Sequence, residues 1–426
     1  MWGPETSPGW WDGKSYKHRE DMNIALDNIL SRTKGDRWIW LIVILLSTIS
    51  MMAVYSSTGT IAYQHDTGAE RYLMKHMFMI FGGIALMYIS HKLDYRYYAG
   101  ISKVLMAITI PLLIYTLIFG SHVNDASRWV AIPGTGLTFQ TSDLAKLALI
   151  TYLARTLSRK QENIKDVKQS FIPIMGSVCV VFILIALANL STALMLFGVS
   201  ILLLIMGRIS VKQIAVVCLA GAFLLAGVVL LGPRRATYKS RIEAFMHPEH
   251  TNSDKSFQAD HAKIAIATGG VFGKGPGNST ERNYLPQSYS DFIYATIVEE
   301  YGLIGGLLVI AIYLFLLYRC VKIVTKAPKA FGALLAAGLS FSLTIQAFAN
   351  MAIAVGLGPV SGVPLPLVSM GGTSILFTSV AFGIILSVSR HIDETTGENA
   401  VGKEGSLKET NKRESNKVVV GEIEMA

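Results

Sequence analysis

Long apolar runs alternate with short polar connections along most of the chain. Ten of these runs approach the roughly 20 residues that an α-helix needs to cross a bilayer. They are Trp38–Ser57, Leu73–Ser90, Gly100–Gly120, Ser142–Leu157, Phe171–Leu187, Leu190–Met206, Gln213–Gly232, Phe292–Tyr318, Phe331–Val355 and Val368–Ser389. The pattern therefore predicts an all-α polytopic membrane protein with about ten transmembrane helices, spread over residues 38–390.

Three parts of the chain depart from this pattern. Residues 1–37 are polar and aromatic, show no signal peptide and are expected to be cytoplasmic, with Met22 as an alternative start. Residues 391–426 are rich in Lys, Glu, Ser and Asn, so a disordered cytoplasmic tail is predicted there. Residues 233–291 form by far the longest connection, between the seventh and eighth runs, and connections of this length are usually functional.

Composition supports the membrane prediction, and charge gives its orientation. Of the 426 residues, 51% are hydrophobic and 16% are charged, whereas soluble domains average roughly 25% charged residues. Lys and Arg in short loops favour the cytoplasmic side. With both termini inside, residues 233–291 become external, and the short external loops hold only Arg71 and Arg128. The inner connections and helix ends then hold Lys92, Arg96, Arg155, Arg159, Lys160, Lys165, Lys168, Arg208, Lys212, Arg319, Lys322, Lys326 and Lys329.

Several other classes of function find no support in the composition. The net charge of +9 follows mostly from the loop bias and does not indicate nucleic-acid binding. The three cysteines lie in apolar runs or at their ends, and the histidines of the long connection show no metal-ligand spacing. No metal site and no cofactor motif is therefore predicted, although a divalent cation could assist a diphosphate ligand.

The middle of the long external connection combines a helical pattern with a glycine-rich stretch. The segment "FQADHAKIAIATGGVFGKGPGNS" begins as an amphipathic helix, with Phe257, Ile264 and Ile266 available to lie on the membrane. It then breaks into glycines, whose backbone N–H groups can approach a phosphate closely. The stretch lacks the GKS/T ending of a Walker A loop. Phosphate binding and an ordinary turn both remain open for it.

Three carboxylates follow in "LPQSYSDFIYATIVEE", where a polar segment turns into an apolar run. Asp291 can act as a base or can cap the helix that follows. If that helix starts at Asp291, Glu299 lies about 12 Å farther along its axis and Glu300 faces roughly the opposite way. Neither forms a close pair with Asp291, so both are expected to pair with a basic residue in a structural role.

Two further cations have alternative interpretations. Lys146 follows Asp143 by three residues inside an apolar run, so it either neutralises that carboxylate locally or contacts a diphosphate. Arg128 stands in a short external loop beside Trp129. It either contacts phosphate at the headgroup level or accompanies Trp129 as an interfacial anchor.

Four motifs, in order along the chain, resemble the SEDS family (shape, elongation, division and sporulation) of membrane glycosyltransferases. They are "NDASRW", "FQTSDLAKLA", "AIATGGVFGKGPGNSTERNYLPQSYSDFIYATIVEEYGLIG" and "GPVSGVPLPLVSMGGTS". The resemblance extends from about Trp38 to Arg390, and the long connection and polar tail are closer to the FtsW branch than to the RodA branch. The sequence departs from the usual pattern at Thr141, Asp143, Gln287 and Pro276, and it lacks the usual Pro-Asp after the fifth run.

The resemblance implies a peptidoglycan polymerase of the inner membrane. Such enzymes join lipid II, a disaccharide-peptide on undecaprenyl diphosphate, on the external face, together with a class B penicillin-binding protein and other division proteins. The proposed catalytic acid of the family corresponds to Asp291. We expect substrate contacts from Arg128, Lys146, Gly273, Lys274, Gly275 and Ser369, and structural roles for Trp129, Gln140, Glu299 and Glu300.

The residues also agree with this chemistry without the resemblance. No nucleotide sugar is available outside the cell, so a donor must arrive already activated, as a lipid-linked diphosphate does. One base on the attacking hydroxyl then suffices, with cations for the diphosphate. Proline and glycine prevent a regular helix through Gly358–Gly372, a segment expected to line the pocket around Asp291. A lipid II flippase or transporter, and a non-catalytic division scaffold, remain as alternatives.

Overall fold

The structure is a computed structural model that describes residues 34–64, 69–123, 126–132, 137–164, 166–246, 254–285 and 288–395. Its main compact unit is Trp38–Ile392, and the description below concerns this unit. Most of the predicted cytoplasmic segment and of the predicted disordered tail lie outside the described residues. The tail was expected to begin at residue 391, but the last helix continues through Thr395.

Each of the ten predicted runs corresponds to a helix, which confirms an all-α polytopic membrane protein. The helices are α2 (Arg37–Gln64), α3 (Ala69–Lys92), α4 (Tyr95–Phe119), α5 (Thr141–Arg159), α6 (Ile172–Ala188, entered through the short π-helix η1, Val167–Phe171), α7 (Leu190–Met206), α8 (Val211–Leu231), α11 (Ile293–Lys326), α12 (Ala330–Ala354) and a C-terminal helix (Ser374–Thr395). Within the described residues, eight helices are long and apolar enough to span a bilayer. Helix α7 is apolar but shorter, and α5 carries several charged residues.

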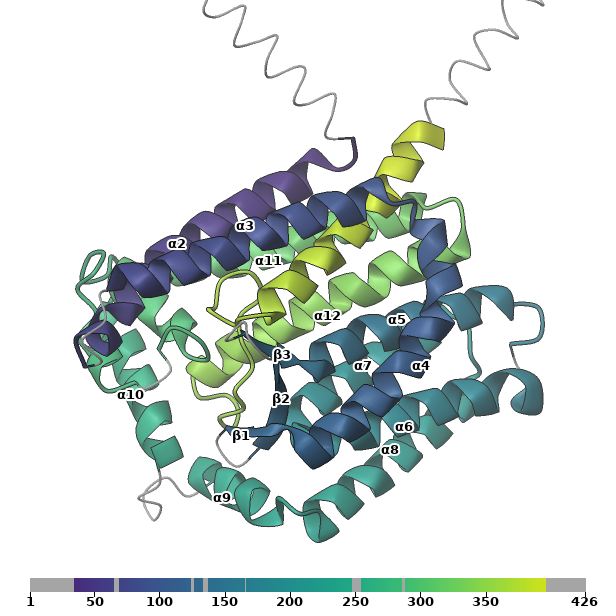
Figure 1. Ribbon diagram of the computed structural model, residues 1–426, viewed down its shortest axis with the longest axis horizontal. Coiled ribbons are helices and arrows are strands. Elements are labelled where there is room, and N and C mark those ends of the chain that lie inside the picture. Colours follow the sequence, from purple (N-terminus) through teal and green to yellow (C-terminus); the bar gives the residue numbers. More distant parts are fainter. Residues whose placement is uncertain are drawn as a thin grey trace, which may run out of the picture. The chain divides into compact units, whose positions relative to one another are not determined.

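Burial separates a central from a peripheral part of this bundle. Helix α12 and the C-terminal helix are the most enclosed, with 67% and 72% of their apolar windows buried. Helix α8 lies at the edge (Figure 1) with 17% buried, and it presents side chains such as Phe223 outward. Lipid is as apolar as these side chains, so outward exposure costs nothing in a bilayer.

Helix α11 is longer than a bilayer requires. Its 34 residues extend about 51 Å at 1.5 Å per residue, against a hydrocarbon core about 30 Å thick. Residues 293–300 are buried in protein, whereas Leu303 and Ile304, just after the non-helical Gly302, are 52% and 53% exposed. Helix α11 therefore has two parts, buried first turns and a part from Leu303 on that presents apolar side chains outward. It contains nearly all of the expected run Phe292–Tyr318 and continues beyond it to Lys326.

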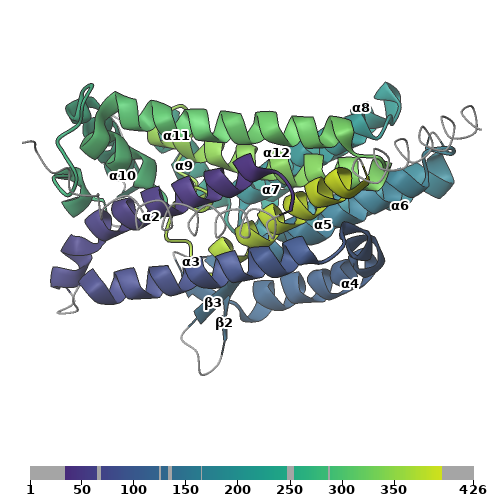
Figure 2. The same cartoon turned by 90° about the horizontal axis from the view of Figure 1, so that it is seen from above.

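Two of the connections also contain regular structure. The long connection holds α9 (Arg235–Met246), α10 (Asp254–Gly269) and the 3-10 turn η3 (Glu281–Asn283), and Figure 2 shows α10 beside the start of α11 at one end of the bundle. Helix α10 occupies the segment in which the sequence predicts an amphipathic helix, and Phe257 and Ile264 are exposed as expected. Ile266, also expected to lie on the membrane, instead packs against the core. The short loop after α4 forms an antiparallel sheet, which the sequence did not predict: β1 (Ser121–Val123), β2 (Ala126–Ile132) and β3 (Leu137–Gln140).

The sheet is anchored to the start of the C-terminal helix by Thr373. The Thr373 hydroxyl donates to the Thr138 carbonyl at 3.0 Å and receives the Gln140 N–H at 3.4 Å. In the sheet register, Trp129 of β2 lies opposite Gln140 of β3. These contacts attach the loop after α4 to the end of the Gly358–Gly372 segment and so position both near the start of α5.

Candidate active site

Asp291 lies in the turn that leads into α11. Its side chain is half-buried, and the Ser290 hydroxyl donates to its Oδ1 at 3.1 Å. The N-cap of α11 is Phe292, whose side chain makes no capping hydrogen bond. Asp291 is therefore not the cap of this helix, and the capping alternative is wrong.

Buried polar side chains hold this turn in place. Asn350 of α12 donates through Nδ2 to the Asp291 carbonyl at 2.8 Å and to the Val363 carbonyl at 2.7 Å. Ser369 donates to the Ser290 carbonyl at 2.6 Å and accepts the Leu365 N–H at 2.8 Å. The irregular Gly358–Gly372 segment thus packs against the Asp291 turn, as the sequence indicates.

Ser369 has a different position from the one its predicted role requires. Its side chain is buried to 1% exposure, and its hydroxyl already bonds two backbone groups. A hydroxyl in this position supports the turn from behind. We therefore interpret Ser369 as a positioning residue in place of the substrate contact expected from the sequence.

Two arginines of the long connection, Arg234 and Arg241, lie near each other on α9 and its N-terminal flank, and Asp291 is within electrostatic reach of Arg241. Arg234 is buried and donates through Nη1 to the Ala188 carbonyl at 2.6 Å. Burial lowers the pKa of Arg241, the positive charge of Arg234 lowers it further, and the carboxylate of Asp291 acts in the opposite direction. Neither arginine has a sequence pattern of its own. The available signal was the excess of cations in a connection predicted to be external.

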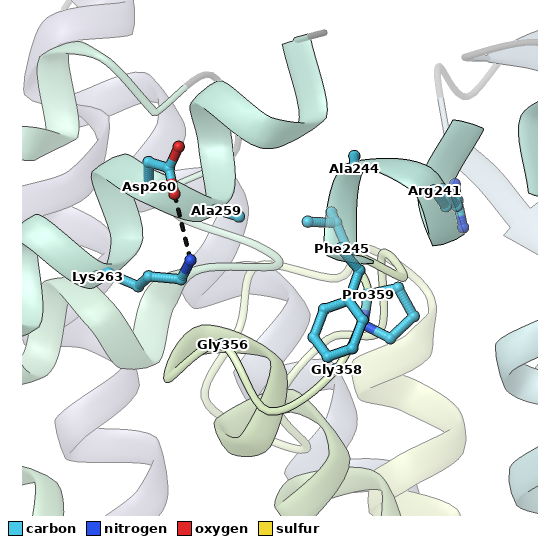
Figure 3. Close-up of a pocket in the computed structure, with 10 residues that line it drawn as sticks. Arg241, Ala244, Phe245, Ala259, Asp260, Lys263, Gly356, Gly358 and Pro359 are labelled. Atoms are coloured by element: carbon cyan, nitrogen blue, oxygen red, sulfur yellow. Dashed lines mark hydrogen bonds and ion pairs between the residues drawn. The ribbon is translucent and has the colours of Figure 1, made fainter. Parts of the chain in front are cut away.

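A pocket opens beside these arginines, between α9, α10 and the turn after α12 (Figure 3). It encloses about 500 Å³ of empty space, part of which is open to solvent. The lining residues are Arg241, Ala244, Phe245, Ala259, Asp260, Lys263, Gly356, Gly358, Pro359 and Val360. The pocket is thus mostly apolar, with three charged side chains.

The glycine-rich stretch pairs with α11 through its backbone. The N–H groups of Lys274 and Gly275 donate to the carbonyls of Glu299 and Glu300, both at 2.9 Å, and the Gly273 N–H donates to the Gly269 carbonyl at 2.9 Å. These amides are occupied within the protein, so they are not presented to an anion. The geometry thus favours a structural role for Gly273 and Gly275 over the expected phosphate contact.

Glu299 and Glu300 complete this connection from the side of α11. Glu299 is fully buried and accepts from Lys274 Nζ at 2.6 Å and from the Thr280 N–H at 3.0 Å. Glu300 is buried and accepts from the Ser56 hydroxyl of α2. Glu299 thus has the basic partner that the sequence predicts. Lys274 is predicted to contact substrate, but in the structure its ammonium group forms an ion pair with Glu299.

We expect a double-mutant cycle to detect the Glu299 and Lys274 pair. Replacing Lys274 by Met leaves a buried carboxylate without its cation, which should destabilise the protein by about 2 kcal/mol, below the roughly 3 to 5 kcal/mol of fully buried pairs because Lys274 is partly exposed. Glu299→Gln should add little to Lys274→Met. Thermal melting in detergent measures both single variants and the double variant, and purely additive losses would contradict a direct pair.

Lys146 lies in a polar chain inside the bundle. Its Nζ contacts Asp143 Oδ1 and Gln346 Oε1, both at 2.8 Å, and Gln346 Nε2 donates to the Pro364 carbonyl at 2.9 Å. The local ion pair, one of two alternatives for Lys146, is therefore present. A diphosphate contact by Lys146 stays a prediction. The chain links α5 through α12 to the segment that packs against Asp291.

The remaining predicted residues lie in and beside the small sheet. Arg128 belongs to β2, and its side chain lies outside the described residues. Trp129 is half-buried in the same strand. Gln140 ends β3, is buried and donates through Nε2 to the Ser142 hydroxyl at 3.0 Å. The sheet therefore gives Trp129 and Gln140 structural surroundings.

Comparisons with known proteins agree over nearly the whole membrane unit. The family described as "Cell cycle protein", which groups FtsW, RodA and SpoVE, matches residues 36–394. Stage V sporulation protein E of Bacillus subtilis is 33% identical over 367 residues, which are 84% of this chain and 98% of that protein. The probable peptidoglycan glycosyltransferase FtsW of Geobacter metallireducens is 33% identical over 380 residues, 88% of this chain and 100% of that protein.

Solved structures share the fold at lower identity. A chain of the structure described as "Structural coordination of polymerization and crosslinking by a peptidoglycan synthase complex" has a TM-score of 0.68 and 23% identity, over 84% of this chain and 98% of that one. The rod shape determining protein RodA of Thermus thermophilus has a TM-score of 0.61 and 21% identity, over 84% and 97%. Since the family match covers residues 36–394 and the relatives align over nearly their full length, this chain belongs to the FtsW, RodA and SpoVE family.

Proposed function

We propose that this protein is a peptidoglycan glycosyltransferase that polymerises lipid II on the external face of the inner membrane during cell division, with Asp291 as general base. The observation that carries the proposal is the half-buried side chain of Asp291, which stands in a turn whose backbone carbonyls accept hydrogen bonds from Asn350 and Ser369. Arg241 is within electrostatic reach of its carboxylate. The names of the relatives support the reaction type, since several are probable peptidoglycan glycosyltransferases.

The proposed reaction needs one base and a stabilised leaving group. Asp291 takes the proton of an acceptor sugar hydroxyl, and the oxygen attacks the anomeric carbon of the donor. The bond from that carbon to the diphosphate breaks, and the electron pair leaves with the undecaprenyl diphosphate. A diphosphate departs without a proton, unlike the alkoxide that a glycosidase must protonate with a second carboxylate. Glu299 and Glu300 are bound elsewhere, which suits a single-base mechanism.

The partner and the orientation belong to the same proposal. We expect a class B penicillin-binding protein to act with this chain, because a solved relative in fold is described as part of a peptidoglycan synthase complex. The positive charges of the short connections favour cytoplasmic termini and an external Asp291. The FtsW relatives favour duty in division, although one relative is a sporulation protein.

The proposal is tested with the full chain and its class B penicillin-binding protein, purified together and reconstituted in vesicles that contain lipid II. We expect glycan strands, seen as a ladder of products on a gel, in proportion to the amount of complex. Lipid II that crosses the bilayer without forming polymer would favour a flippase. A complex that assembles but does neither would favour a scaffold. Both results would contradict the proposal.

Asn350 is expected to position the Asp291 turn for this reaction. Replacing Asn350 by Leu removes both hydrogen bonds from Nδ2, to the carbonyls of Asp291 and Val363. The turn then loses its attachment to α12, and misplacing a catalytic group by about 1 Å can cost roughly 100-fold in rate. We expect kcat for polymerisation to fall at least about tenfold while lipid II binding changes little. Equal losses in binding and kcat would contradict a positioning role.

A further inference from the structure

The pocket between α9, α10 and residues 356–360 carries cations on two of its walls (Figure 3). Arg241 comes from α9 and Lys263 from α10, while Phe245 and Pro359 form an apolar surface between these helices and the turn. Lys263 Nζ is 3.2 Å from Asp260, but both side chains are about half exposed, so water screens this pair. The pocket thus combines apolar contact area with positive charge.

Arg241 is the less compensated of the two cations. Its Nε atom is buried and has no hydrogen-bond partner among the described residues. The nearby guanidinium of Arg234 repels it and burial penalises its charge, and together these lower its pKa. A guanidinium is a planar set of donors that suits phosphate oxygens. A partly buried guanidinium beside a second one is most stable when an anion binds between or beside them.

The backbone at Gly356 packs closely against the side chain of Lys263. Its φ of +81° favours glycine, and a Cβ at this position would lie 2.7 Å from Lys263 Cε. The lysine stem therefore lies against the turn after α12, which keeps its ammonium group at the pocket wall. A side chain at residue 356 would have to displace this stem.

We propose that this pocket binds the diphosphate of the lipid-linked donor, with Arg241 and Lys263 as its cationic contacts. The inference rests on the proposed function, because it uses the position of Asp291. If Asp291 activates the acceptor hydroxyl, the donor's anomeric carbon lies next to that hydroxyl, and its diphosphate lies on the far side of that carbon. Arg241 lies within electrostatic reach of the Asp291 carboxylate.

The proposal assigns a distinct part of the donor to each wall. Arg241 stabilises the negative charge that grows on the leaving oxygen as the bond to the anomeric carbon breaks. Lys263 contacts the second phosphate as a point charge. Phe245 and Pro359 contact the first carbons of the lipid, which must pass from the external pocket into the bilayer. Helix α10 exposes Phe257 and Ile264, which suits a helix at the membrane surface.

Equilibrium binding of undecaprenyl diphosphate without its sugar tests the site. We use the full chain in lipid nanodiscs, with inorganic pyrophosphate as a second probe. Arg241→Gln should weaken undecaprenyl diphosphate binding by roughly 10- to 100-fold, and Arg241→Lys by less, since charge without the planar donors remains. Lys239→Gln is the matched control, because Lys239 lies exposed on the same helix and pairs with Glu243, and binding should stay within about twofold.

Lys263→Gln gives an independent result if Arg241→Gln fails to fold. Because Lys263 is about half exposed, the fold should tolerate its replacement, and binding should weaken by roughly three- to tenfold. Unchanged binding of undecaprenyl diphosphate in a folded Arg241→Gln protein, or in Lys263→Gln, overturns the assignment. Weaker binding of inorganic pyrophosphate with unchanged binding of the lipid-linked form also overturns it, because the site would then serve free phosphate.

Different results would contradict the diphosphate site and the proposed polymerase function. Binding that depends on Arg241 in a protein that makes no glycan strands leaves the diphosphate site standing and contradicts the polymerase proposal. Normal polymerisation and normal binding in Arg241→Gln contradict the site and leave the polymerase proposal standing. If both are right, Arg241→Gln lowers kcat as well as raising KM for lipid II, because its charge acts on the leaving group in the transition state.

Discussion

Replacing Asp291 by Asn is expected to reduce glycan-strand formation by roughly 100- to 10,000-fold, the range that a general base typically contributes. Asn has nearly the same shape, and its oxygen can still accept the hydrogen bond from the Ser290 hydroxyl. It cannot take the proton of the acceptor hydroxyl at neutral pH. The loss should therefore fall on kcat, with the turn and the bound lipid II in place.

The measurement compares polymer formation and lipid II binding in the same reconstituted complex. Glu243→Gln is a suitable control, because Glu243 is a half-exposed carboxylate of α9 in the same long connection and its replacement also removes one negative charge. We expect that variant to polymerise at the rate of the unmodified protein. Asp291→Asn protein that polymerises at that rate would rule out Asp291 as the base, whereas loss of lipid II binding would indicate a binding role.

The apolar runs predicted the ten helices of the bundle, but not α9 in the long connection. Spanning a bilayer requires about 20 apolar residues, and this requirement leaves a signal in any sequence. The same signal does not separate the two parts of α11, because buried residues such as Ile293 and Ala295 are as apolar as the exposed ones after Gly302. Composition cannot tell a helix turn buried in protein from one buried in lipid. The exposed side chains after Gly302 make that distinction in the structure.

The site was predictable in part, for related reasons. Asp291 stood out because a carboxylate at the start of an apolar run is unusual, and because the surrounding motif resembles a known family. Arg241 did not stand out, since one cation among many in a long connection has no pattern of its own. The short strands β1, β2 and β3 were missed because their pairing depends on contacts with each other and with Thr373.

The glycine-rich stretch shows why a local motif can mislead. Glycines permit close approach of a backbone, and the approaching group can be a phosphate or another piece of the chain. Here a Cβ on Gly273 would lie 2.2 Å from the Glu300 carbonyl oxygen, so the approaching group is α11. The glycines in the sequence indicate only that another group approaches the backbone closely. In the structure that group is the backbone of α11, so the stretch is not an anion site. The packing of residues 269–277 against α11 is called the clasp below.

Replacing Gly302 by Ala is expected to break this clasp, with a cost of more than about 3 kcal/mol in stability or a failure to accumulate in the membrane. Gly302 has φ +69° and ψ −170°, a conformation that is essentially restricted to glycine. A Cβ there would lie 2.2 Å from the Val271 carbonyl oxygen and 2.5 Å from the Gly273 nitrogen. These are backbone atoms, so no side-chain rotation relieves the contact.

Replacing Gly270 by Ala tests backbone strain alone, without the steric clash that a Cβ at Gly302 would cause in the same clasp. Gly270 also has a positive φ, of +56°, but a Cβ there would meet nothing within 4 Å. It should cost only the roughly 1 to 2 kcal/mol of a left-handed alanine. Thermal melting of both variants in detergent provides the comparison, and equal melting temperatures would show that the packing of residues 269–277 against α11 contributes little.

Replacing Gly302 should affect activity as well as stability, because of where the clasp lies. The Leu303 N–H donates to the Gly270 carbonyl at 2.9 Å, so the clasp fixes α11 where its buried first turns give way to its lipid-facing part. Asp291 lies at the outer end of those first turns. If Gly302→Ala protein still folds, α11 can straighten and carry Asp291 away from the Gly358–Gly372 segment, which itself stays attached to α12 through Gln346. Polymerisation should then fall further than the loss of folded protein explains, because the base and its supporting segment belong to different elements, which Asn350 and Ser369 join beside Asp291.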